Sequence, residues 1–136
     1  MSDVRDGVYL DASALVKLII TEAESDALRT ILGDAPTLYS SRIAAVEVRR
    51  AVGRQSERDA GQQLDALLGV VQFVELDEQI TRAAAAARPP SLRTLDAIHL
   101  AAATSISEGV RAVVAYDTRL AAAVRGAGWE VVAPGN

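Results

Sequence analysis

Short apolar runs alternate with longer segments of helical spacing along nearly the whole chain. The runs that predict strands cover 8–11, 37–39, 72–76, 112–116 and 129–132. Strands that alternate with helices imply right-handed crossovers and a parallel sheet that helices cover on both faces. The sequence therefore predicts an α/β domain of three layers, α/β/α, with a central, mostly parallel sheet of about five strands.

Capping and breaking residues set the limits of the predicted helices. Ser40 or Ser41 can cap a long helix, Asp77 can cap a later one, and Gly33 and Gly69 end the helices before them. The predicted helices cover about 15–19, 25–32, 41–54, 60–68, 78–87, 95–107 and 118–125.

Length and composition indicate one cytoplasmic domain. The 136 residues suit a single domain over 1–136, in which 1–6 form a short N-terminal extension. The absence of cysteine excludes disulfides and thiolate chemistry and suits a reducing compartment. No stretch approaches the roughly 18 consecutive apolar residues of a membrane span, so we expect no membrane partner. The formal charge of −4 argues against a broad basic surface for nucleic acid.

Four acidic residues are expected at one edge of the predicted sheet. Asp11 and Asp117 come at the ends of two strands, and the carboxyl ends of parallel strands meet at the same edge. Glu47 lies about two turns into the helix after Ser40 and Ser41, and Asp96 opens the helix at 95–107. We expect these four acids to form the catalytic site.

Several carboxylates in one pocket need a cation. They repel each other and raise their own pKa values, and a hard divalent ion removes that cost. Ligands that offer only oxygen favour Mg²⁺ or Mn²⁺, which can activate water for the hydrolysis of a phosphate ester. The acids around such an ion do not repel phosphate as free acids would, because the charge of the ion offsets theirs.

Each acid taken alone also has a purely structural explanation. Asp11 and Asp96 can be helix caps, Glu47 can be a solvated helix residue, and Asp117 can be a turn residue. The four acids become a specific signal only when their local sequences are considered together.

Those local sequences resemble the PIN-domain nucleases, in particular the VapC-type toxins of toxin–antitoxin pairs. The resemblance occurs in the order of the family and spans almost the whole chain. It is carried by YLDASALVKL (9–18), SSRIAAVEVRRA (40–51), LRTLDAIHLAAA (92–103) and VVAYDTRLAAA (113–123).

The resemblance implies a PIN-like fold and an Mg²⁺- or Mn²⁺-dependent endoribonuclease that activates water. Its RNA substrate is transfer, ribosomal or messenger RNA, and the sequence does not choose among them. The resemblance also implies a cognate antitoxin that blocks the acidic pocket, and a homodimer.

Within the family pattern, the first and third acids, Asp11 and Asp96, hold the metal most directly. Glu47 and Asp117 complete the site directly or through water. Ser13 can orient a carboxylate or cap a helix, and the hydroxyls of Thr94 and Thr118 can support the site or serve as caps.

The single histidine and several basic residues lie near the predicted site. His99 falls on the helix face of Asp96, and we expect it to pack beside the site or to hold a backbone carbonyl. Arg50, Arg54 and Arg58 would form one stripe if their helix extends that far. Possible contacts to RNA or antitoxin are Lys17, Arg49, Arg50, Arg54 and Arg93.

Two other functions remain as alternatives. A catalytically idle PIN module would act only by binding, but it has no need of all four acids. A small phosphatase would need an aspartyl nucleophile in a D-x-D pattern, whereas Asp11 is followed by Ala12 and Ser13.

Overall fold

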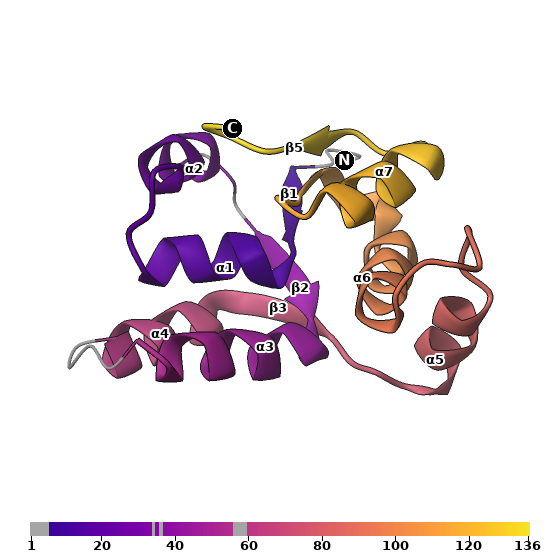
Figure 1. Cartoon of the computed structure of the whole chain (residues 1–136), viewed down its shortest axis with the longest axis horizontal. Helices are drawn as coiled ribbons and strands as arrows, with labels where there is room; N and C mark the ends of the chain where they lie inside the picture. The colour runs from indigo at the N-terminus through magenta and orange to yellow at the C-terminus, as the bar shows by residue number, and fades with distance from the viewer. Residues whose placement is uncertain (1–5, 34, 36, 56–59) are drawn as a thin grey trace.

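Five parallel strands form one sheet at the centre of the molecule (Figure 1). The structure, a computed structural model, describes residues 6–33, 35, 37–55 and 60–136. Neighbouring strands are parallel throughout the order β3-β2-β1-β4-β5, which confirms the predicted parallel sheet. The strands are β1 (Gly7–Leu10), β2 (Leu38–Ser41), β3 (Val71–Val74), β4 (Val110–Val114) and β5 (Val131–Val132).

Helices connect the strands, and two of them begin at the predicted caps. The Ser41 hydroxyl accepts a hydrogen bond from the Ile43 N–H at 3.2 Å, and Asp77 Oδ1 accepts one from the Ile80 N–H at 2.9 Å. No helix in the described ranges is long and apolar enough to cross a membrane. The described helices are α1 (Ala12–Ile19), α2 (Ser25–Leu32), α3 (Arg42–Gly53), α4 (Ala60–Val70), α5 (Glu78–Ala85), α6 (Thr94–Ser105), α7 (Thr118–Gly126) and the short 3₁₀ helix η1 (Ser107–Gly109).

The alternation of side chains along β1 separates two aliphatic cores. Val8 and Leu10 enter a core with residues of α1 to α4, whereas Tyr9 enters a core with residues of α6 and α7. Figure 1 shows α1, α3 and α4 on one side of the strands and α5 and α6 on the other. The three predicted layers, α/β/α, are therefore present.

Several element boundaries differ from the prediction because neighbouring strands fix the register. The runs 72–76 and 112–116 shift back to β3 and β4, and 129–132 shortens to β5, where Val131 and Val132 pair with Val113 and Val114. Helix α4 continues through Gly69 until Val71 pairs with Leu38. The helices predicted at 78–87 and 95–107 each end two residues early.

Candidate active site

The candidate site lies at the carboxyl ends of the central strand, β1, and its neighbour β4. The chain runs from β1 outward to β2 and β3, then returns to β4 and β5 on the other side. Ligands of open parallel sheets bind in the crevice at such a reversal of strand order. Asp11 directly follows β1, and its N–H donates to the Val114 carbonyl at 3.1 Å. Asp117 follows β4 by three residues, so both carboxylates come from the predicted edge of the sheet.

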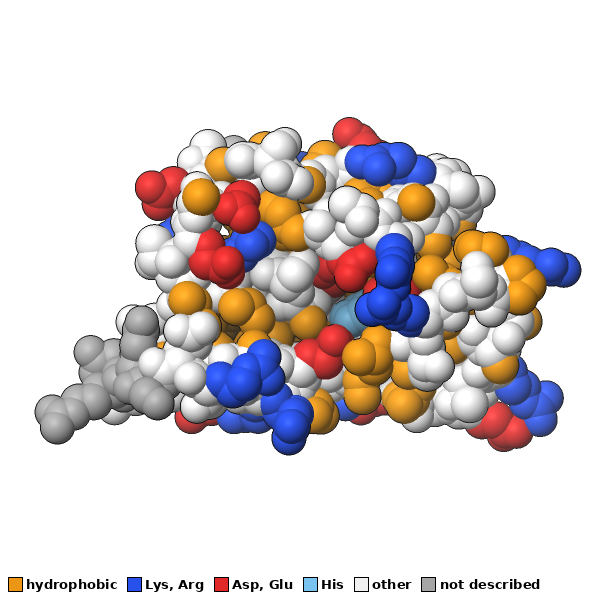
Figure 2. Space-filling model, viewed as in Figure 1, with side chains coloured by type: hydrophobic (Ala, Val, Ile, Leu, Met, Phe, Trp, Pro, Cys, Tyr) orange, Lys and Arg blue, Asp and Glu red, His pale blue; other side chains and the backbone are white. Residues whose placement is uncertain are grey.

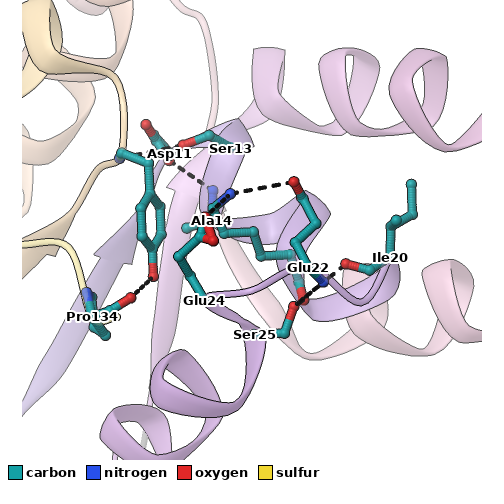
Figure 3. Close-up of polar contacts among 10 residues, drawn as sticks. Asp11, Ser13, Ala14, Ile20, Glu22, Glu24, Ser25 and Pro134 are labelled. Atoms are coloured by element: carbon teal, nitrogen blue, oxygen red, sulfur yellow. Dashed lines mark hydrogen bonds and ion pairs between the residues drawn. The ribbon is translucent and has the colours of Figure 1, made fainter. Parts of the chain in front are cut away.

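Asp11 is a buried helix cap that uses only one of its two carboxylate oxygens for hydrogen bonds. Its side chain is 3% exposed, and Oδ1 accepts hydrogen bonds from the Ala14 N–H at 2.9 Å and the Ser13 hydroxyl at 2.6 Å (Figure 3). Burial raises the pKa of the Asp11 carboxyl, these hydrogen bonds lower it, and the nearby charge of Asp117 raises it further. The cap uses only Oδ1, so Oδ2 has no hydrogen bond within the described part of the chain and remains for a ligand.

Asp117 repeats this arrangement in an exposed setting. It caps α7, and its Oδ1 accepts from the N–H groups of Arg119 at 2.9 Å and Leu120 at 3.2 Å. Its residue is solvent-exposed, unlike Asp11. The capping explanation for Asp11 therefore holds, whereas Asp117 is a helix cap and the expectation of a turn residue is wrong. Neither cap uses Oδ2, which stays available for a ligand.

Asp96 lies in the first turn of α6 and does not cap it. The N-cap of α6 is Arg93, which makes no capping hydrogen bond through its side chain. Partial burial raises the pKa of the Asp96 carboxyl, and the charges of Asp117 and Glu47 raise it further, whereas His99 and Arg93 lower it. Glu47 of α3 and Asp117, the N-cap of α7, are therefore both close enough to Asp96 to raise its pKa, as expected for acids at the same edge of the sheet.

Two buried side chains, Tyr9 and His99, form a series of contacts that ends at Glu47. The Tyr9 hydroxyl lies 2.7 Å from His99 Nδ1, and His99 Nε2 lies 2.9 Å from Glu47 Oε1. Burial, and then the charge of Asp11, raises the pKa of the Tyr9 phenol well above its usual 10.0, so the phenol keeps its proton. When that proton is donated to Nδ1, a neutral imidazole carries its own proton on Nε2 and donates it to Glu47.

His99 thus has a more specific place than the sequence predicted. It packs beside the site, as expected, but it contacts the phenol and the carboxylate, so the expected bond to a backbone carbonyl is wrong. Sequence reasoning did not single out Tyr9. The only signal for it was a polar aromatic residue within an otherwise apolar strand. Figure 2 shows acidic side chains gathered around the histidine at the middle of one face.

The supporting hydroxyls have unequal roles. The Ser13 hydroxyl donates to Asp11 and accepts weakly from the Tyr116 N–H at 3.4 Å, so it orients the carboxylate. Its alternative role as a helix cap is wrong because Asp11 caps α1. Thr94 and Thr118 are exposed first residues of α6 and α7 and are not the caps of these helices.

The structure gives Lys17 a different role from the predicted contact with RNA or antitoxin. Lys17 is 8% exposed, and its Nζ lies 3.1 Å from Glu24 and 3.6 Å from Glu22. The ammonium also lies 4.7 Å from the centre of the Tyr116 ring. Figure 3 draws Glu22 and Glu24, the two glutamates of this network. Because these partners already engage the ammonium, its burial argues against a phosphate contact.

The arginines predicted to contact RNA or antitoxin differ in whether an acidic side chain already pairs with them. Arg49 pairs with Asp65 at 3.3 Å, while Arg50 and Arg54 are exposed. Helix α3 ends at Gly53, with Arg54 as its C-cap, so the stripe does not continue as one helix. Arg58 lies outside the described residues, as do residues 1–5 of the N-terminal extension. Arg93 is exposed beside Asp96.

The donor set fits a hard divalent cation that takes few protein ligands. All four acids offer oxygen alone, and Asp11 and Asp117 each keep one oxygen out of their capping bonds. Within the described ranges, no three His, Cys, Asp or Glu side chains form a group that encloses an ion by itself. Mg²⁺ commonly takes one or two carboxylates and fills its remaining positions with water and phosphate oxygens, so the site suits it.

Comparisons with known proteins agree with this architecture. The model of the PIN domain matches residues 8–126. Ribonuclease VapC46 of Mycobacterium tuberculosis (strain ATCC 25618 / H37Rv) is 40% identical over 129 residues, which cover 93% of this chain and 97% of the relative. Ribonuclease VapC47 of Mycobacterium tuberculosis (strain CDC 1551 / Oshkosh) is 37% identical over 132 residues, which cover 94% and 97%.

Solved structures show the same fold. VapC20 of Mycobacterium tuberculosis, described as a sarcin-ricin loop cleaving toxin, has a TM-score of 0.72 and 18% identity, with 93% of this chain and 99% of that chain covered. VapBC2 from Rickettsia felis, solved with a DNA fragment from its promoter, has a TM-score of 0.68 and 15% identity, with 94% and 98% covered.

Fold and site together define a three-layer α/β protein with acidic side chains at the carboxyl edge of its parallel sheet, where the strand order reverses. The chain belongs to the PIN domain family, and within that family it is of the VapC type.

Proposed function

We propose that this chain is the toxin of a toxin–antitoxin pair and acts as an Mg²⁺- or Mn²⁺-dependent endoribonuclease in the cytoplasm. The observation that carries the proposal is the placement of the acids in a PIN fold: Asp11 and Asp117 follow neighbouring parallel strands at one edge of the sheet, and His99 of α6 contacts Glu47 of α3. The charge of Asp117 raises the pKa values of both Asp11 and Asp96. Relatives named ribonucleases, 37% and 40% identical, support the same reaction.

In this proposal Asp117 completes the site directly or through water, and the other three acids have specific tasks. Asp11 and Asp96 hold the ion, and Ser13 keeps Oδ1 of Asp11 engaged so that Oδ2 is the oxygen available for binding. When bound, the ion supplies a Lewis acid that lowers the pKa of water and offsets negative charge on the phosphate. Glu47, fixed by His99 through Oε1, offers Oε2 as an acceptor for a proton of the attacking water. The oxygen of water bonds to phosphorus, a P–O ester bond breaks, the leaving oxygen takes a proton from solvent, and Glu47 then returns its proton to solvent.

The proposed substrate is structured RNA, and the proposed partners are an antitoxin and a second copy of the chain. A fold neighbour named for cleavage of the sarcin-ricin loop makes a ribosomal RNA hairpin a good first substrate, with transfer and messenger RNA tested beside it. Light scattering with and without the product of the adjacent reading frame would test both partners. A protein that stays monomeric and does not bind that product would contradict both the antitoxin and the homodimer.

The decisive experiment compares RNA 5′ ends after brief expression of the wild type and of Asp11→Asn or Asp96→Asn. We expect discrete new ends and arrested growth with the wild type only, because asparagine keeps the shape of the side chain without its charge. Purified protein should cut RNA with Mg²⁺ and stop in EDTA. If both variants cut RNA at the wild-type rate in EDTA, the proposed mechanism is wrong.

Calorimetric titration with Mg²⁺ and Mn²⁺ separates the enzyme from the idle PIN module. We expect binding to the wild type and a large loss of affinity in Asp11→Asn. A folded wild type that binds neither ion at millimolar levels would favour the idle module.

A further inference from the structure

A groove lies next to the acidic crevice, between α7 and the segment that joins α5 to α6. Its volume is about 860 Å³. Apolar groups form most of its lining, and three arginines contribute guanidinium groups to the remainder. Its main lining residues are Arg88, Leu92, Arg93, Leu100, Arg119 and Ala123.

The three arginines of this groove are available for an anion. Arg42, Arg49 and Arg82 each form an ion pair, but Arg88, Arg93 and Arg119 form none with any residue that the structure describes. No Asp or Glu appears among the residues that line the groove. This local excess of positive charge stands out in a chain of formal charge −4. Guanidinium groups match the geometry of phosphate oxygens, which makes a polyanion the fitting occupant.

Two of these arginines connect the groove to the acids of the candidate site. Arg93 precedes Asp96 by three residues, and its charge lowers the pKa of the Asp96 carboxyl. The N–H of Arg119 donates to Asp117 Oδ1 at 2.9 Å. In Figure 2, basic side chains lie directly beside the acidic side chains and the histidine. A strand whose phosphate sits at the acids can therefore continue into the groove.

We infer that this groove binds the RNA strand next to the bond that is cut. Arg88, Arg93 and Arg119 contact its phosphates, and the apolar part of the lining packs against a base or ribose. The inference rests on the proposed function and specifies where the substrate extends from the site. Phosphate contacts position a strand without reading its sequence, so the groove contributes affinity and register rather than sequence preference.

Binding and cleavage by matched arginine variants test this inference. The groove variant is Arg88→Gln with Arg119→Gln, and the control is Arg111→Gln with Arg125→Gln. The control removes two exposed arginines that lie outside the groove, so it causes the same change of charge. The probes are fluorescently labelled transfer RNA and a labelled ribosomal hairpin. Anisotropy is measured on the Asp96→Asn background, and cleavage is measured with Asp96 intact.

We expect the groove variant to bind RNA about tenfold more weakly than the control. Its plot of log affinity against log salt should lose about 0.7 to 0.9 of slope per arginine. KM for cleavage should rise while kcat at saturating RNA stays near that of the control. Equal RNA affinity, salt slope and KM in the two variants would overturn the inference.

Two other outcomes separate a failure of this inference from a failure of the proposed ribonuclease function. A groove variant that loses affinity for the antitoxin but binds RNA like the control would mark the groove as a protein site and overturn the inference. Wild-type protein that leaves RNA intact in Mg²⁺ would overturn the proposed function, and the assignment of the cleaved strand with it.

Discussion

Asp11 and Asp117 follow neighbouring strands and cap the next helix in the same way, yet their surroundings differ. Asp11 is 3% exposed and bonded to Ser13, whereas Asp117 is solvent-exposed. Both carboxylates use Oδ1 for the cap and keep Oδ2 free of capping bonds. The comparison shows that capping sets the direction of a carboxylate, while burial sets the cost of its charge. The buried acid therefore has the most to gain from a cation.

The largest difference between the two acids should appear in catalysis. Asp11→Asn should reduce kcat about a thousandfold, because the ion loses a buried charged ligand whose contribution is several kcal/mol. Asp117→Asn should reduce it about tenfold, because water can compensate at an exposed position. Rates of cleavage of a labelled RNA in Mg²⁺ measure both. Equal losses would remove the distinction between the buried and the exposed acid.

Loss of the side-chain contacts from Tyr9 through His99 to Glu47 should have the next largest effect on activity. His99→Leu should lower Mg²⁺ affinity or kcat about 10- to 100-fold, because Glu47 loses the partner that orients it. His99→Gln should recover part of the loss, since an amide can both accept from Tyr9 and donate to Glu47. Calorimetry and single-turnover rates measure the effect. If leucine and glutamine perform alike, the histidine contributes only packing.

The shared capping role predicts a smaller effect on folding. Replacing aspartate by alanine rather than asparagine at either position removes the capping acceptor and should cost about 1 kcal/mol of unfolding free energy. Denaturant unfolding of the alanine and asparagine variants at positions 11 and 117 measures the difference in unfolding free energy at each position. Similar values at positions 11 and 117 would support equivalent caps, and no difference at either position would contradict the capping geometry.

Burial predicts the smallest effect, a dependence of stability on pH that Asp11 contributes and exposed Asp117 is not expected to share. The pKa of its carboxyl is raised in the folded state, so its contribution to stability is full below the unfolded value and is lost as pH rises through the folded value. The loss begins near the ordinary pKa of 3.8. In EDTA near neutral pH, Asp11→Asn should therefore melt a few degrees above the wild type, and the gap should close in acid.

Melting curves across that pH range test the sign, with Asp117→Asn as the exposed control. A wild type that melts above Asp11→Asn near neutral pH without metal would contradict it. Added Mg²⁺ should raise the melting temperature of the wild type and leave Asp11→Asn nearly unchanged.

Much of the fold followed from local patterns. The alternation of apolar runs with helical spacing predicted the parallel sheet, and Ser41 and Asp77 cap helices where their sequence positions indicated. Strand boundaries were less predictable: 112–116 became Val110–Val114 because Val113 and Val114 pair with both β1 and β5. A residue near a strand end has no local reason to prefer strand or loop, so its partners decide.

The sequence by itself determined which acids are candidates for the site, because the carboxyl ends of parallel strands must share an edge and because each acid stands in a recognisable local sequence. Only the tertiary structure decided how each acid is used. Packing buries Asp11 and leaves Asp117 exposed. It places Glu47 in contact with His99, which contacts Tyr9. It also pairs buried Lys17 with Glu22 and Glu24. Burial and contacts between distant residues depend on how α1, α3 and α6 pack together, and no local pattern encodes those distances.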